Sequence, residues 1–270
     1  MTVLVTGARG RIARSLISRL TSAGTPIRVA SSHPGPGEVR LDLRTGEGLA
    51  EALDGVDRVL LYTQPGGVEA FLQAAHGVRH VVQVSSSAVL YGGGSIAARH
   101  KAVEDALLSS GLPVTVLRPG AFAANSLRWA ESIHARSTVE FAYPDARYAP
   151  VQEDDIAAVA QAVLDAGSHL GEALTLTGPE ALSYRQQVAI LAEVLDRPIT
   201  VGTISRQQAT ERRPAFIPAE VMAELLDTDA RCVDEPTLVT DTVPAITGAP
   251  ARGFRRWAAD HRAEFGAPQG

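Results

Sequence analysis

Short apolar runs recur along the chain, separated by segments in which the apolar positions have helical spacing. Runs rich in valine, leucine and isoleucine are typical of strands that are buried on both faces. The segment after the first run places Ile12, Leu16 and Leu20 on one side of a helix. The runs predict strands over 2–6, 27–30, 39–43, 58–62, 80–85, 112–117 and 174–177, with helices over 12–20, 49–53, 67–76 and 96–109 between them. This alternation predicts an α/β fold, a doubly wound parallel sheet with a smaller C-terminal lobe packed on it.

The first predicted strand leads directly into a glycine turn and a helix. Gly7 lets the chain turn sharply, and Gly10 lets backbone N–H groups approach a pyrophosphate. Ala13 is small enough for the helix to pack closely on the strand, and the helix N-terminus offers N–H donors and a partial positive charge. This order predicts a dinucleotide-binding unit of the Rossmann type; a glycine turn in another kind of α/β protein is the alternative. The expected cofactor contacts here are Gly7, Ala8, Arg9, Gly10, Arg11 and Ile12.

The residues after the second predicted strand bear on the choice of cofactor. An acidic side chain there would hydrogen-bond the ribose of NAD and repel the 2′-phosphate of NADP. The sequence has Ser31 and Ser32 instead, and no carboxylate before Glu38. Hydroxyl groups suit a phosphate, and Arg9 in the glycine turn can add a cation. We therefore expect NADP(H) rather than NAD(H); alternatively, the two serines only begin a loop and Arg9 is solvated.

Polar residues also follow later strands, at the sheet edge where ligands of open parallel sheets bind. Ser85 and Ser86 end the fifth run, and this position favours a place beside the nicotinamide. At the end of the fourth run, the expected cofactor contacts are Thr63, Gln64 and Pro65.

Composition and charge narrow the function classes. Of the 270 residues, 45% are hydrophobic and 20% are charged, which is ordinary for a globular protein with a substantial core. The net charge of −5 and the lack of a lysine or arginine run argue against a nucleic-acid partner, and we expect no metal. Cys232 is the single cysteine, so no intrachain disulfide can form, and we interpret it as a bystander thiol in a reducing compartment.

The start of the chain and its hydropathy bear on location. Residue 2 already begins a strand, which leaves no room for a signal peptide, and no apolar run approaches the roughly 18 residues of a membrane span. We therefore expect a cytoplasmic protein without a membrane partner. The expected partner is a small-molecule substrate, and a homodimer is compatible with the sequence.

Several motifs together resemble one family. The turn G-x-x-G-x-x-A over 7–13 and the segment T-x-L-R-P-G-x-F over 115–122 are typical of it. So are D-I-A over 155–157, L-T-G-P-E over 176–180 and the T-G…F-x-x-W tail over 247–257. The chain is similar over nearly its whole length to the NmrA-like atypical (extended) short-chain dehydrogenase/reductases, including their quinone-reductase-like branch.

The resemblance implies a division of the chain and further site residues. We expect an NAD(P)-binding Rossmann domain over 1–137, to which 151–177 return, and a mainly substrate-binding lobe over 138–270. By the resemblance, Asp42 contacts the adenine together with Leu43. The expected substrate contacts are Phe122, Asn125 and Tyr143, of which Asn125 matches an asparagine that faces the family's cleft.

The sequence departs from the resemblance at the usual catalytic residues. Working short-chain reductases have Ser…Tyr-x-x-x-Lys, in which the tyrosine donates a proton to the carbonyl oxygen. Counting back from Lys101 places Ala97 at the tyrosine position. His100 begins an H-x-x-x-E segment that resembles quinone-reductase-like members, whereas Lys101 and Glu104 can equally be a solvent-exposed helical pair. The catalytic candidates are Ser86, Tyr91, His100 and Lys101, with Lys101 also expected at the cofactor ribose.

Three interpretations of this departure stay open. Another group donates the proton, with Tyr91, His100, Tyr143 and Tyr148 as candidates; or the acceptor is a quinone or enone that takes its proton from water; or nothing is catalysed. We favour an NADPH-dependent oxidoreductase that transfers hydride to a carbonyl, quinone or enone of a small, largely apolar substrate. The alternatives are a non-catalytic NADP(H)-binding redox sensor and a redox-neutral, epimerase-like enzyme with a tightly bound cofactor.

Overall fold

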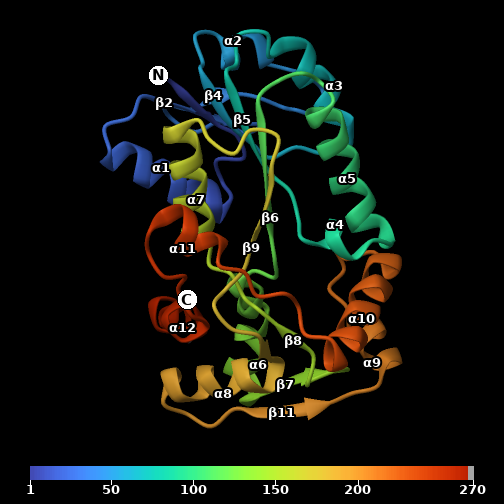
Figure 1. Cartoon of the computed structure of the whole chain (residues 1–270). Helices are drawn as coiled ribbons and strands as arrows, with labels where there is room; N and C mark the ends of the chain where they lie inside the picture. The colour runs from blue at the N-terminus through green and yellow to red at the C-terminus, as the bar shows by residue number, and fades with distance from the viewer. Residues whose placement is uncertain (267–270) are drawn as a thin grey trace. The chain divides into compact units, whose positions relative to one another are not determined.

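The computed structural model describes residues 1–266, which divide into two compact units (Figure 1). The first unit contains Met1–Pro119, Glu153–Leu176 and Thr242–Ala249. The second contains Gly120–Gln152, Thr177–Asp241 and the described residues after 249. Each unit is therefore assembled from segments that are far apart in the sequence.

A seven-stranded parallel sheet forms the centre of the first unit (Figure 1). The strands are β1 (Val3–Val5), β2 (Ile27–Ser31), β3 (Val39–Arg40), β4 (Arg58–Leu61), β5 (His80–Val84), β6 (Val114–Pro119) and β9 (Ala173–Leu176). Their order is β3-β2-β1-β4-β5-β6-β9, so β1 lies between β2 and β4, and the chain crosses to the other half of the sheet after β3. The fold class predicted from the apolar runs is confirmed, and open α/β sheets bind ligands outside such a switch point.

Two groups of helices cover this sheet. They are α1 (Arg11–Ser22), α2 (Leu49–Leu53), α3 (Pro65–Ala74), α4 (Ala88–Tyr91), α5 (Gly94–Leu108), α7 (Glu153–Ala166) and α11 (Thr242–Thr247). One group has α7 in contact with α1 and α11, and the other has α3 in contact with α2 and α5 (Figure 1). In the first turn of α7, Asp154 accepts a hydrogen bond from Ser15 of α1 at 2.6 Å, which joins the two helices.

A buried hydroxyl fixes the end of β1. The Thr6 side chain donates to the carbonyl oxygen of Leu60 at 3.0 Å and accepts from the N–H of Tyr62 at 2.9 Å. These two bonds attach the end of β1 to β4 immediately before the chain turns at Gly7. Strand β1 itself is apolar, and all three of its residues are buried.

The second unit contains short elements around an aromatic core. Its elements are η1 (Ala123–Trp129), α6 (Ala130–Arg136), β7 (Thr138–Phe141), β8 (Arg147–Tyr148), β10 (Leu182–Ser183), α8 (Tyr184–Leu195), β11 (Thr200–Thr203), α9 (Arg206–Glu211), α10 (Ala219–Asp234), α12 (Phe254–Asp260) and η2 (Arg262–Phe265). Strands β7 and β11 pair in parallel, and β8 and β10 pair antiparallel. Phe254, Trp257 and Phe265 are buried together with Leu191 of α8.

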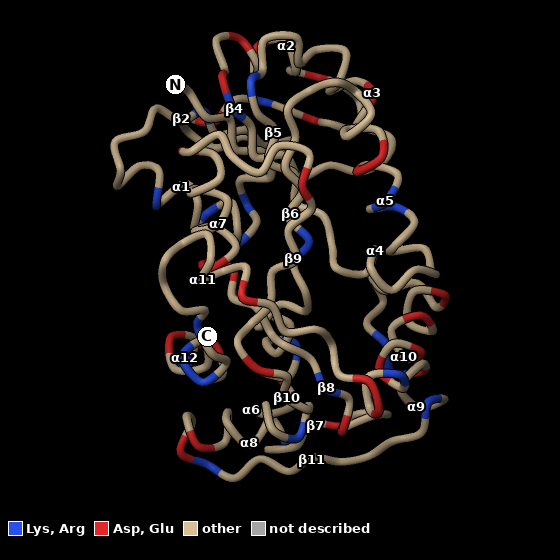
Figure 2. The backbone as a smooth tube through the Cα atoms, in the orientation of Figure 1, with Lys and Arg blue, Asp and Glu red and all other residues tan. Residues whose placement is uncertain are grey.

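The two units differ in extent from the division expected from the sequence. The first unit ends at Pro119 rather than at residue 137, because η1 and α6 cluster with the later segments. The return over Glu153–Leu176 lies close to the expected 151–177, and Thr242–Ala249 is a second return that the sequence did not indicate. In residues 1–266 no helix is long and apolar enough to span a membrane, and acidic and basic residues are interspersed along the chain (Figure 2).

One glycine of α3 has no room for a side chain. A Cβ atom on Gly67 would lie 2.4 Å from the carbonyl oxygen of Leu43 and 2.9 Å from Oγ1 of Thr63. A Cβ atom on the preceding Gly66 would meet nothing within 4 Å. Helix α3 therefore approaches the loop after β3 more closely than any other residue at position 67 would allow.

We predict that Gly67→Ala destabilises the protein by about 1–3 kcal/mol, because the new methyl group overlaps backbone that cannot rotate away. The matched variant Gly66→Ala should be neutral or stabilising by up to about 1 kcal/mol, since alanine favours a helix over glycine. Urea unfolding of the two variants measures the difference. Equal losses from both substitutions would contradict the proposed close approach.

Candidate functional site

The glycine turn after β1 has the geometry of a phosphate cradle. Gly7 has φ +66°, a backbone conformation that favours glycine, and its carbonyl oxygen accepts from the N–H of Gly10 at 2.8 Å. Gly10 is the N-cap of α1 and has no side chain to cover the first-turn amides of the helix. Ala8 is buried, whereas the side chains of Arg9 and Arg11 are exposed. The N-terminus of a helix, with its partial positive charge, suits an anion such as a pyrophosphate.

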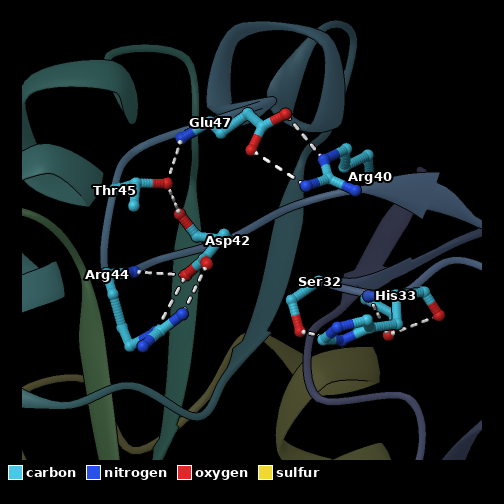
Figure 3. A network of polar contacts seen from close by, with 8 residues as sticks. Ser32, His33, Arg40, Asp42, Arg44, Thr45 and Glu47 are labelled. Carbon is cyan, nitrogen blue, oxygen red and sulfur yellow. Dashed lines mark hydrogen bonds and ion pairs between the residues drawn. The ribbon is translucent and has the colours of Figure 1, made fainter.

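The turn after β2 lies against Arg9. The Arg9 guanidinium donates to the carbonyl oxygen of His33 at 2.5 Å, and Ser31 Oγ accepts from the N–H of His33 at 3.2 Å. The Ser32 hydroxyl lies 3.1 Å from Nδ1 of His33 (Figure 3). The first carboxylate after β2, that of Glu38, accepts from the N–H of Gly35 at 2.9 Å. The structure thus brings Arg9, Ser31 and Ser32 together beside the glycine turn.

Asp42 already has a partner within its own turn. Its carboxylate accepts from the backbone N–H of Arg44 at 2.9 Å and from the Arg44 guanidinium at 3.0 and 3.3 Å (Figure 3). The hydrogen bonds from the Arg44 side chain, and then from its backbone, hold the pKa of Asp42 below its usual value. The adenine contact expected for Asp42 and Leu43 stays a prediction, and it requires acceptor capacity that Arg44 leaves unused.

The residues after β4 begin helix α3. Gln64 is its N-cap, Pro65 is its first residue, and Thr63 is buried with its hydroxyl 3.3 Å from the carbonyl oxygen of Gln64. Proline is well suited to this first helical position, because its missing N–H would have no partner in the helix. The expected contacts therefore lie at the carboxyl edge of β4, next to β1.

A buried carboxylate joins β5, β6 and α5. Glu104 of α5 is 1% exposed, and its Oε1 accepts from the Ser85 hydroxyl at 2.5 Å and from Nε of Arg118 at 3.0 Å. Oε2 of Glu104 also binds the Arg118 guanidinium, so the two side chains form a two-pronged ion pair that raises the pKa of Arg118. Ser85 itself is 4% exposed and directly follows β5.

Ser86 and Tyr91 lie in the segment after Ser85. Ser86 is half-buried, and its Oγ accepts from the N–H of Ala88 at 3.2 Å. Tyr91 ends α4 with 41% of its surface exposed, directly before three glycines with positive φ. The structure therefore keeps Ser86 at the strand edge and places Tyr91 on an exposed helix end.

The two faces of α5 separate the remaining catalytic candidates. Ala97, His100 and Glu104 follow one another at helical spacing on the inner side, where Ala97 is 6% exposed and His100 is half-buried. Burial lowers the pKa of His100, and the Glu104 carboxylate partly opposes this. Lys101 lies on the outer side and pairs with Asp105 at 2.5 Å. The exposed pair is thus Lys101–Asp105, whereas Glu104 points inward.

The expected substrate residues all belong to the second unit. Phe122 is the N-cap of η1 and pairs with Val151, and Asn125 is exposed, with its carbonyl oxygen accepting from Arg128 at 3.2 Å. Tyr143 follows β7 and is half-buried beside Arg206. Their contacts with substrate stay predictions.

Two tyrosines of the second unit share one acidic residue. Tyr148 and Tyr184 both donate to Oδ1 of Asp229, at 2.6 and 3.0 Å. Burial raises the pKa values of all three groups; for Asp229 the hydrogen bonds from the two tyrosines, and then the Arg128 guanidinium, partly oppose this rise in pKa. The Tyr184 ring also stacks on Phe141 with centroids 4.6 Å apart, and Trp129 meets both rings edge-on. These aromatic side chains are packed against one another in the second unit.

Sequence reasoning missed the contacts of three residues in these sites. The sequence places Glu104 in the H-x-x-x-E segment and beside Lys101, but neither pattern indicates its bonds to Ser85 and Arg118, although the apolar positions 97, 103 and 107 place 104 on the inner face of α5. Arg118 was noted only as part of a motif. Asp229 carried no local signal, since its partners are 45 and 81 residues away in the sequence.

The fold and the glycine turn define a dinucleotide-binding protein of the Rossmann class. Residues 7–166 match the family of NAD(P)H-binding domains, and the chain belongs to this family, within the NmrA-like atypical short-chain reductase group.

Named relatives extend this assignment. The chain is 37% identical to a (4-alkanoyl-5-oxo-2,5-dihydrofuran-3-yl)methyl phosphate reductase of Streptomyces griseus, over 97% of this chain and 99% of that protein. It is 29% identical to an NAD(P)H azoreductase of Xenophilus azovorans, over 98% and 99%. Its fold matches the NADPH complex of the quinone oxidoreductase QOR2 of Escherichia coli with a TM-score of 0.83 at 22% identity, over 96% and 99%. These relatives support an NAD(P)-dependent reductase in general.

We predict that Lys101→Ala changes cofactor affinity and turnover by less than about two-fold, because an exposed ion pair contributes little. The motif predicts that Lys101 binds the ribose and takes part in catalysis. The outward position of its side chain does not favour these roles, and the expected result of this substitution differs from what the motif predicts. Cofactor titration by fluorescence and steady-state rates measure both quantities. A loss of several orders of magnitude would restore the role expected from the motif.

Proposed function

We propose that the protein is an NADPH-dependent reductase whose substrate is a small, largely apolar molecule with a conjugated carbonyl, such as an enone or a quinone. The observation that carries this proposal is the inner face of α5. This face carries Ala97 and His100 together with Glu104, which binds Ser85, whereas the single lysine of the helix faces solvent. No tyrosine–lysine pair is available there as an acid.

The chemistry of the remaining groups favours a conjugated acceptor. When bound, the cofactor would supply a hydride from its nicotinamide ring. Because burial lowers the pKa of His100, its imidazole is neutral near pH 7 and is a weak proton donor. The Ser86 hydroxyl can orient a substrate oxygen by a hydrogen bond. A conjugated carbonyl that accepts hydride at carbon forms an enolate, which can take its proton from water, so a strong acid is not required.

The residues at the glycine turn fit the cofactor. Gly7 and Gly10 have no side chains that would keep a pyrophosphate from the N-terminus of α1, and the guanidinium of Arg9 lies at the turn that carries Ser31 and Ser32. This cationic turn supports a preference for NADPH, because the 2′-phosphate would gain charge-assisted hydrogen bonds there.

The relatives support the same reading. The phosphate reductase of Streptomyces griseus acts, by its name, on an acyl-substituted dihydrofuranone, a ring whose carbon–carbon double bond is conjugated with carbonyl groups. The structurally similar QOR2 is named a quinone oxidoreductase. The dihydrofuranone and the quinone in these two names are both hydride acceptors of the class proposed for this chain.

We predict that the purified protein oxidises NADPH with an acyl-dihydrofuranone, a quinone or a cyclic enone, and at least about ten-fold more slowly with the matching saturated ketone. The loss of NADPH absorbance measures each rate. Comparable rates with the saturated ketone would contradict the proposed acceptor class. Tight NADPH binding without oxidation of any acceptor would instead favour the redox sensor.

We predict that Arg9→Ala raises the Kd for NADPH by roughly ten-fold or more and the Kd for NADH by less than about two-fold, since one charge-assisted hydrogen bond to the 2′-phosphate is lost. Arg79→Ala serves as the control, because Arg79 is exposed and pairs with Asp57 at 3.6 Å. Calorimetric titration with both cofactors gives the four values. Equal weakening of NADPH and NADH by Arg9→Ala would place Arg9 away from the 2′-phosphate.

A further inference from the structure

Ser85 and Ser86 are adjacent, but their hydroxyl groups are bound in opposite ways. Ser85 donates its proton to Oε1 of Glu104 at 2.5 Å, whereas Ser86 Oγ accepts from the N–H of Ala88 at 3.2 Å. A hydroxyl group has one proton and two lone pairs. The Ser85 hydroxyl is therefore left with acceptor capacity alone, whereas the Ser86 hydroxyl keeps its proton for a ligand.

The direction of the Ser85 hydroxyl is fixed from three sides. A carboxylate only accepts hydrogen bonds, so the buried Glu104 cannot donate to Ser85 in return. Arg118 holds both oxygens of Glu104 and prevents the carboxylate from turning away. The backbone of Ser85 is bound as well, since its N–H donates to the carbonyl oxygen of Leu117 at 2.7 Å. Turning the Ser85 proton outward would remove a hydrogen bond from a buried charge, which is costly.

We propose that Glu104 is a positioning residue, held by Arg118, that makes Ser85 an acceptor for the amide N–H2 group of the nicotinamide, while Ser86 donates to the substrate oxygen. This inference rests on the proposed function, because it requires a nicotinamide cofactor at the carboxyl edge of β5. An acceptor that cannot donate distinguishes the two ends of a carboxamide: it binds the N–H2 group and rejects the oxygen. A ribose hydroxyl, which can both donate and accept, would gain no such selection. Ser85 thereby determines which way the carboxamide is turned.

The test compares NADP⁺ with its 3-acetylpyridine analogue, in which a methyl group replaces the amide nitrogen. Equilibrium titration gives the ratio of the two Kd values without any turnover. We expect the wild-type protein to prefer NADP⁺ by roughly five- to ten-fold, the effect of one hydrogen bond. Ser85→Ala should bring the ratio close to one. Ser86→Ala should keep the wild-type ratio and lower kcat for the reduction of an enone.

Glu104→Gln tests the positioning role separately. The glutamine oxygen is needed by Arg118, so its N–H2 group faces Ser85 and turns the Ser85 proton outward. The preference for NADP⁺ should then fall below that of the wild type or reverse in favour of the acetyl analogue, which offers only an acceptor. Asp105→Asn is the matched control on the next residue of α5, where the carboxylate is exposed and pairs with Lys101, and it should leave the ratio unchanged. A merely structural role of Glu104 would weaken both dinucleotides alike.

The ratio stays interpretable if a variant is destabilised, because only folded protein binds either dinucleotide. An unchanged preference for NADP⁺ in Ser85→Ala, or in Glu104→Gln, overturns this inference and leaves the proposed reductase intact. Failure of the wild-type protein to bind any nicotinamide dinucleotide overturns the proposed function and this inference together.

Discussion

The buried carboxylate of Glu104 is the constraint on which the ligand edge of the first unit depends. Removing such a charge from water costs several kcal/mol, and the cost is offset here by the two-pronged Arg118 pair and the Ser85 hydroxyl. Buried ion pairs of this kind are weak sources of stability. What this pair provides is geometry, because it holds the end of β5, the end of β6 and the inner face of α5 in one fixed relation.

Much of the first unit could be predicted because its signals are local. Each buried strand is a short run of aliphatic residues, and the glycine turn needs only seven consecutive residues to be recognised. Helix α2 even has the predicted bounds, Leu49–Leu53, since a glycine precedes it and Gly55 follows soon after it. The elements of the second unit were harder to predict from the sequence. Its elements are short, and its two small sheets pair segments such as β7 and β11 that lie far apart in the sequence.

The candidate site was harder to predict because its side chains form hydrogen bonds and ion pairs with residues that are distant in the sequence. A motif counted from Lys101 indicates the outer face of α5, whereas His100 and the buried Glu104 lie on the inner face. The family resemblance predicts Asp42 at the adenine, and the neighbouring Arg44 already binds its carboxylate. Position along a strand thus locates the ligand edge, but it does not tell which polar atoms are already engaged.

The first unit is assembled from three separate segments of the chain, and this affects folding during translation. When synthesis has passed Pro119, β6 still has an unpaired edge, and the sheet still lacks α7, because β9 and α7 come from Glu153–Leu176. The last piece, α11, follows only with Thr242–Thr247. An exposed strand edge invites pairing with other chains. The nascent protein therefore exposes the edge of β6 until Ala173–Leu176 has been synthesised, and the sheet receives its last helix, α11, only after a further 66 residues or more.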